Sequence, residues 1–255
     1  MKIHLKMVCG FLSYMLMNSM VFAIAIDCAN ESQLSSVLKH VKITRSTSDL
    51  VDCKLLPNQP NTQLIAYAEW RSEPHEPEVG DYVLSLISWD QQQHKVNDVY
   101  HVKEHFVSDA IGLESLQLDT AAYQLNPNLR AVGVRLNYHG QSQPNPFSMQ
   151  LLNLYDLKNK RQVLQSLVVD RYRAETDTRC NADVEQRKST LKMLNTKTQR
   201  VADMQLNSKI ERYEMSGGEN NCNETQRQST QQKFILKFDG QQYQVPTAFK
   251  DEYVY

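Results

Sequence analysis

Two stretches of the chain, 82–102 and 147–172, share one pattern of apolar and polar positions. Each has an apolar run, then a short polar run that begins with Asp90 or Asp156, then a second apolar run. The β-branched and aromatic residues of the apolar runs suit a half-buried pleated surface, and the polar runs are too short for a helix. Each stretch therefore predicts an antiparallel hairpin.

Further strand pairs are predicted on both sides of these hairpins. Alternating positions favour a pair at 113–123 and 129–138, a weaker pair at 190–193 and 199–213, and a final pair at 234–238 and 241–245. The last pair surrounds an Asp-Gly step, the turn that permits positive φ at both central positions. Polar turns rather than helices join the strands, which argues against a parallel βαβ sheet. We expect an all-β protein of antiparallel hairpins in a small propeller-like or sandwich arrangement.

One short N-terminal helix is expected at 30–41. Its apolar residues follow the i, i+3, i+4, i+7 spacing of an amphipathic helix, and Asn30 or Ser32 is available as the N-cap. Between the strands, 73–78 and 141–146 are rich in proline and polar residues and are predicted to be exposed loops. The stretch 216–232 has no apolar side chain other than Cys222 and is predicted to be a long solvated loop.

The first residues have the composition of a secretory signal peptide. Lys2 and Lys6 precede an apolar run at 7–21, which ends in Ala23-Ile24-Ala25. This order of basic, apolar and small residues predicts cleavage after Ala25. A retained membrane anchor is the alternative, but the run is shorter than the roughly 20 residues that a span needs. We expect a signal peptide at 1–25, a single disulfide-bonded β domain at 26–255, no membrane span in the mature chain, and a periplasmic or secreted location.

Four cysteines lie outside the expected signal peptide, and they fit an oxidising compartment. Four cysteines allow three pairings, of which proximity favours Cys28 with Cys53 and Cys180 with Cys222. Each bridge would stabilise the fold by about 3–4 kcal/mol in the chain-entropy model. A metal site or a reactive thiol is the alternative, but no pair has Cys-x-x-Cys spacing.

Net charge bears on the class of partner. Removal of residues 1–25 takes two lysines from the 28 basic residues and nothing from the 29 acidic ones, which leaves a net charge of −3. A nearly neutral chain argues against nucleic acid or an anionic membrane surface as the partner.

One short motif suggests a metal. The order His101-Val102-Lys103-Glu104-His105 matches His-x-x-Glu-His of the inverted zinc peptidases, in which two histidines one helical turn apart bind Zn²⁺ and the glutamate activates water. That mechanism needs a helix and a third ligand, whereas this segment continues a strand pattern. We therefore expect His101 and His105 to face solvent at the end of a strand, with no metal and no cofactor.

No other catalytic motif is present. The sequence lacks a Gly-x-Ser-x-Gly elbow, a phosphate-binding glycine loop and a Cys-His pair free of the expected disulfides. Long loops of compact β domains are frequently functional, so the loops supply the candidate binding residues. These candidates are Glu73, His75, Glu76, Glu78, Asn145, Glu219, Asn220 and Asn221.

The sequence therefore predicts an exported protein of a Gram-negative-type cell envelope that acts by binding rather than by catalysis. The expected partner is another protein of the envelope, for example an envelope-targeting toxin or enzyme that this chain neutralises as an immunity protein or inhibitor. Two alternatives stay open. One is a zinc-dependent envelope hydrolase that uses the His-x-x-Glu-His motif, and the other is a structural or glycan-binding envelope protein.

Overall fold

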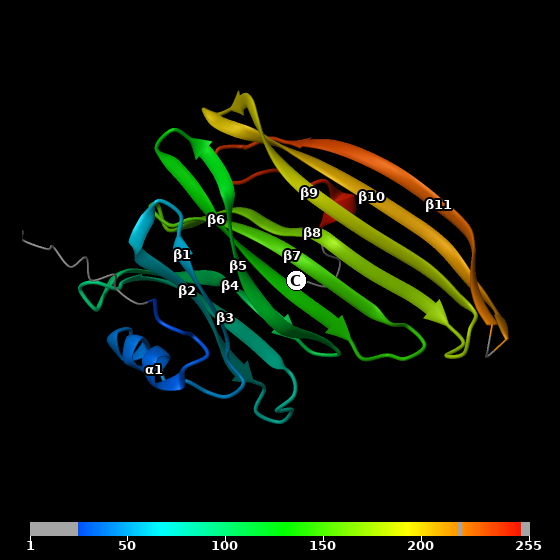
Figure 1. The fold of residues 1–255 in the computed structure, drawn as a ribbon, viewed down its shortest axis with the longest axis horizontal. Helices are drawn as coiled ribbons and strands as arrows, with labels where there is room; N and C mark the ends of the chain where they lie inside the picture. Colours follow the sequence, from blue (N-terminus) through cyan, green and yellow to red (C-terminus); the bar gives the residue numbers. More distant parts are fainter. Residues whose placement is uncertain (1–24, 219–220, 251–255) are drawn as a thin grey trace, which may run out of the picture.

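The computed structural model describes residues 25–218 and 221–250, which form two antiparallel sheets and one short helix (Figure 1). The signal peptide expected at 1–25 lies outside the described residues except for Ala25. The elements in chain order are α1 (Glu31–His40), β1 (Leu50–Leu56), β2 (Gln59–Ser72), β3 (Gly80–Asp90), β4 (Lys95–Ser108), β5 (Ile111–Asn126), β6 (Leu129–Gly140), β7 (Phe147–Asp156), β8 (Arg161–Thr176), β9 (Ala182–Thr198), β10 (Val201–Gly218), β11 (Asn221–Leu236) and the 3₁₀ turn η1 (Thr247–Phe249).

The all-β prediction with one N-terminal helix is confirmed, in the form of two packed sheets. The small sheet has the order β1-β2-β3-β4, and the large sheet has the order β11-β10-β9-β8-β7-β6-β5. Sequence neighbours pair within each sheet, as expected for hairpins joined by short turns. The two hairpins predicted at 82–102 and 147–172 are present, as β3–β4 and β7–β8.

The main hydrophobic core lies between the two sheets. Leu84 and Leu86 of β3 belong to the same buried cluster as Val134 of β6 and Leu151 of β7. Alternation along each strand sends these side chains to the face that meets the other sheet. Burial of this shared face holds the sheets together.

Helix α1 covers the other face of the small sheet. Leu34, Val37 and Leu38 are fully buried against a cluster that includes Tyr67 and Trp89. The Asn30 side chain accepts a hydrogen bond from the Gln33 amide at 3.2 Å, so the predicted N-cap is confirmed. The predicted disulfide between Cys28 and Cys53 joins the start of the helix to β1.

Side chains of β1 cap the open edge of β5 in the large sheet. The Leu118 amide donates to Oδ2 of Asp52 at 2.7 Å, and Lys54 Nζ donates to the Leu118 carbonyl. An edge strand otherwise presents unpaired backbone groups. These two side chains therefore satisfy both backbone groups of Leu118 at the β5 edge and link the two sheets.

The C-terminal segment at 237–250 packs between β8 and β10. The Tyr243 amide donates to the Val163 carbonyl at 2.8 Å, and the Tyr243 hydroxyl donates to the Ala202 carbonyl at 2.6 Å. Phe238 and Phe249 are buried in the same cluster as the apolar residues of both strands. Strands β8 and β9 pair only from Asp170 to Thr176 of β8. The C-terminal segment therefore fills the space beside the first part of β8, at 161–169, which does not pair with β9.

The prediction of a long solvated loop at 216–232 was wrong. Nearly all of it that the structure describes belongs to β10 and β11, which pair from Met204 with Leu236 to Gly218 with Asn221. The side chains of β11 are almost all exposed, so this edge strand needs no apolar residues. Its backbone hydrogen bonds, rather than burial, keep it extended.

The predicted terminal hairpin at 234–245 was also wrong in its pairing. Leu236 and the two residues before it pair with β10, which leaves only an isolated bridge between Phe238 and Tyr243. The chain does turn at Asp239-Gly240, where the Asp239 carboxylate accepts from the amides of Gln241 and Gln242, but only Gly240, at a φ of +110°, has the positive φ expected of both central residues. A longer pairing with β10 outcompetes the local one.

Loss of the Asp52 carboxylate is expected to weaken the contact between the sheets. We predict that Asp52→Ala lowers the free energy of unfolding by about 1–3 kcal/mol, because the Leu118 amide loses a charged acceptor. Urea unfolding followed by circular dichroism measures the change. Asp98→Ala is the matched control: Asp98 also accepts from the next amide, but its other partner, Lys160, is exposed, so its loss costs below about 1 kcal/mol. Equal costs for the two variants would contradict the prediction.

Candidate functional site

An open groove of about 800 Å³ lies at one end of the large sheet. In Figure 1 this sheet extends well past the small sheet, toward the right of the view. The groove is formed where β8, β9 and β10 meet the loop at 141–146. It is therefore a feature of the part of the large sheet that the small sheet does not cover.

A single cross-strand row of residues lines the groove from one edge of the sheet to the other. Each of the seven strands contributes one residue, and every residue of the row is directly opposite the next. Directly paired residues point to the same face of a sheet. The row runs Ile111, Gly140, Phe147, Arg173, Glu185, Arg212 and Gln228.

The row changes from apolar to charged as it leaves the region next to the small sheet. Ile111 and Phe147 pack against the core between the sheets. Beyond them lie Arg173, Glu185 and Arg212, which we call the arginine row. One end of the groove is therefore apolar and continuous with the core, and the other end is ionic.

Glu185 is the centre of the arginine row and is only 6% exposed. Its Oε1 accepts from Arg171 at 2.8 Å and meets Arg173 Nε at 3.3 Å. Its Oε2 accepts from Nε and Nη2 of Arg212 at 2.8 and 2.6 Å. Burial alone would raise the pKa of Glu185, but the hydrogen bonds from Arg171 and Arg212 and the charge of Arg173 outweigh it and lower the pKa to about 2.

A fourth guanidinium group lies beside this cluster. Arg187 is directly opposite Arg171 and is 6% exposed. It donates to the Ala248 carbonyl and stacks on the Phe249 ring with 4.5 Å to the ring centroid. Burial and the charge of Arg171 lower the pKa of Arg187. The C-terminal segment therefore packs directly against the fourth arginine of the cluster.

A second row, two residues further toward the strand ends, is acidic. Glu175, Asp183 and Glu214 are directly opposite one another on β8, β9 and β10, and all three line the groove. We call them the acidic row. Gln226 Nε2 donates to Oε2 of Glu214 at 2.8 Å. The groove thus presents a band of positive charge next to a band of negative charge.

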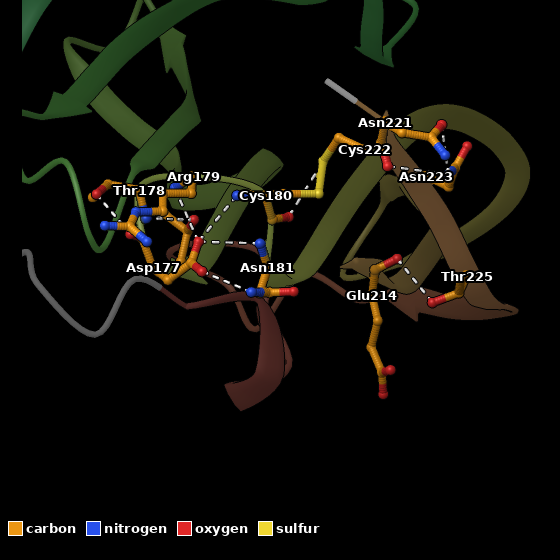
Figure 2. Close-up of a disulfide and its surroundings, with 11 residues drawn as sticks. Asp177, Thr178, Arg179, Cys180, Asn181, Glu214, Asn221, Cys222, Asn223 and Thr225 are labelled. Carbon is orange, nitrogen blue, oxygen red and sulfur yellow. Dashed lines mark hydrogen bonds between the residues drawn. A yellow bond between two sulfur atoms is a disulfide. The ribbon is translucent and has the colours of Figure 1, made fainter. Parts of the chain in front are cut away.

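The second disulfide holds the loops at this end of the sheet. Cys180 in the β8–β9 loop is bonded to Cys222 at the start of β11, as predicted, with their Cα atoms 5.5 Å apart (Figure 2). Asp177 organises the same loop, because its Oδ1 accepts from the amides of Arg179, Cys180 and Asn181 (Figure 2). These backbone hydrogen bonds, with the Asn181 side chain, lower the pKa of Asp177.

Comparisons with protein-family models, curated proteins and solved structures gave no match.

Of the predicted binding residues that the structure describes, only Asn145 lines the groove. Glu73, His75, Glu76 and Glu78 are exposed on the β2–β3 loop, and Asn221 is exposed at the start of β11. None of these five lines the groove. Glu219 and Asn220 lie outside the described residues.

The His-x-x-Glu-His segment lies on strand β4, as expected, and not on a helix. His101 Nδ1 is 2.9 Å from Ser85 Oγ, and His105 Nδ1 is 2.5 Å from Asp81 Oδ2. Glu104 lies on the side of β4 that faces the large sheet, close to Tyr155 of β7. Burial raises the pKa of Tyr155, and the nearby negative charge of Glu104 raises it further. The two histidines therefore have separate partners, and the glutamate lies away from them.

In the described part of the chain, no group of three or more His, Cys, Asp or Glu side chains is arranged to hold a metal ion. Over the same residues, no helix has the length and apolar character needed to cross a bilayer. The two disulfides are typical of an oxidising, non-cytoplasmic compartment.

Replacement of Glu185 is expected to destabilise the fold. Glu185→Gln leaves three guanidinium groups without their shared counter-charge, so we predict a loss of about 3–5 kcal/mol in the free energy of unfolding. Urea unfolding measures it. Glu211→Gln is the matched control, because Glu211 also meets two basic groups, Lys209 and Arg227, but at the surface. A loss for Glu185→Gln no larger than for Glu211→Gln would contradict the prediction.

The same carboxylate predicts a pH dependence. A carboxyl group whose pKa is lowered on folding stabilises the fold above its ordinary pKa, and this contribution is lost as the pH falls through the folded-state value. For Glu185 the ordinary pKa is 4.5 and the folded-state pKa is about 2. The difference in unfolding free energy between wild type and Glu185→Gln should be constant above pH 4.5 and shrink toward pH 2. A difference that does not change between these values would rule out this assignment.

Proposed function

We propose that this protein is a non-catalytic binding protein of the cell envelope that takes an extended segment of another protein into the groove. The observation that carries the proposal is the cross-strand row, in which all seven strands of one sheet contribute to a single lining. Sites built on strands are held more precisely than sites built on loops. Such a groove suits a partner that is recognised by shape and charge.

The lining supports a peptide as the occupant. The apolar end, with Ile111 and Phe147, offers contact area, while the charged rows offer directional hydrogen bonds. Binding interfaces commonly combine an apolar centre with polar groups that fix orientation. A volume of about 800 Å³ accommodates several side chains of an extended segment.

The location in the periplasm or outside the cell is part of the proposal. It is supported by the basic, apolar and small residues of 1–25 and by the two disulfides. Within this class, a role as an immunity protein or inhibitor of an envelope-targeting toxin or enzyme fits a rigid scaffold with a binding groove.

The proposal is tested by filling the groove. Asn145 lines the groove, and its side-chain amide makes no hydrogen bond with a described residue, so Asn145→Trp adds bulk without removing a side-chain hydrogen bond. The affinity-tagged full chain, expressed in its own host, is used to retain proteins from the cell envelope, which are identified by mass spectrometry and then purified. We predict that Asn145→Trp weakens binding of the retained partner at least about tenfold.

His75→Trp is the matched control. His75 is a loop residue of the same sequence-based candidate set, but it does not line the groove. The partner should bind this variant as it binds wild type. Failure to retain any protein, or equal binding by wild type and Asn145→Trp, would refute the proposed function.

A further inference from the structure

Two guanidinium groups of the arginine row have outer N–H groups without acceptors. Arg212 uses Nε and Nη2 to bind Glu185, and Arg173 uses Nε. Nη1 of Arg212 and both Nη atoms of Arg173 have no acceptor among the described residues. Both side chains are more than half exposed and both line the groove. Their remaining donors are therefore accessible to a ligand.

Among the immediate contacts of Glu185, positive charge exceeds negative charge. One carboxylate is shared by Arg171, Arg173 and Arg212, and Arg187 is directly opposite Arg171. Like charges directly opposite on neighbouring strands are unfavourable. An added anion at the groove side of the cluster would reduce this repulsion.

Glu185 holds the guanidinium groups of Arg173 and Arg212 in place in the absence of a ligand. Glu185 is buried and Arg171 is only 13% exposed, so the carboxylate that orients Arg173 and Arg212 has little freedom. A guanidinium group offers a planar fork of N–H donors that matches the two oxygens of a carboxylate or phosphate. Donors held in place in advance lose less entropy on binding.

The acidic row limits where an anion can bind. It lies two residues from the arginine row along each strand, a distance of about 6.5 Å. Glu175, Asp183 and Glu214 repel an anion and attract a cation. A ligand that spans both rows should therefore carry an acidic group next to a basic one.

We propose that Arg173 and Arg212 form an oxyanion subsite of the groove, which binds the carboxylate of an acidic side chain in the partner segment, with a basic side chain of that segment over the acidic row. The identity of the ligand as a protein segment rests on the proposed function. The existence of the oxyanion subsite does not.

Titration with sodium acetate and with inorganic phosphate tests the subsite directly. The side-chain N–H signals of Arg173 and Arg212 are followed by ¹⁵N–¹H NMR, with sodium chloride at equal ionic strength as the reference. We expect the signals to shift and saturate with acetate, and the binding to weaken about tenfold or more in Arg173→Gln and in Arg212→Gln. Arg200→Gln, at the opposite end of β9 and β10, makes the same charge change and should bind as wild type.

The unfolding free energy of each variant is measured alongside. Arg173→Lys is a second variant, which separates loss of the guanidinium donors from destabilisation of the cluster. Lysine keeps the positive charge but not the fork, so Arg173→Lys should fold as wild type and still bind acetate more weakly. Shifts that do not saturate, or that are the same in Arg173→Gln and Arg200→Gln, overturn the subsite. Saturation by phosphate but not by acetate overturns the assignment to a carboxylate.

Peptides separate this inference from the proposed function. An acetylated peptide Ala-Ala-Glu-Ala-Lys-Ala-Ala-amide should bind more tightly than acetate, and its Glu-to-Gln and Lys-to-Gln forms should each bind more weakly. In an extended peptide, side chains two residues apart lie on one face about 6.5 Å apart, which matches the two rows. Acetate binding without peptide binding would contradict the segment as ligand and leave the subsite. A partner whose binding is lost in Asn145→Trp but unchanged in Arg173→Gln would support the proposed function and overturn the assignment of the subsite to the partner segment.

Discussion

The large sheet extends beyond the layers that cover it, and this difference in extent determines which parts of the sheet have apolar side chains and which have charged ones. The small sheet covers the region around Leu136 and Leu151, and the C-terminal segment covers Met204 and Leu206 of β10. At the end formed by β8, β9 and β10 the neighbouring loop at 141–146 leaves an open groove, in which Arg173 is exposed. Apolar residues there would form an exposed patch, so this end is lined by ionic and polar side chains.

A buried carboxylate at such a place requires several partners. Removing Glu185 from water is unfavourable, and one exposed ion pair would offset little of that cost. Hydrogen bonds from Arg171 and Arg212, with Arg173 nearby, offset it through geometry that only three adjacent strands provide. The strand register is thereby coupled to the shape of the groove, because a slip of one residue would send Glu185 to the opposite face.

The sequence predicts the features that depend on neighbours along the chain. The spacing of Leu34, Val37 and Leu38 predicts α1, and the proximity of cysteines predicts both disulfides. It does not predict β11, because an exposed edge strand has no apolar alternation to recognise. It also does not bring Arg173 and Glu185 together, since their pairing depends on the register between two strands. The only local signal is a charge at every second position, as in Glu185 and Arg187.

The groove end of the molecule is held together differently from the rest. Strand β11 contributes little apolar surface there, so the hydrophobic effect that joins the two sheets is weak at this end. The bond between Cys180 and Cys222 takes its place and ties the β8–β9 loop to the β10–β11 hairpin, while the hydrogen bonds to Asp177 order the β8–β9 loop itself. Because the charged rows lie on these same strands, their spacing depends on a covalent link as well as on strand pairing. An oxidising compartment is therefore part of the physical basis of the groove and not only of the stability of the fold.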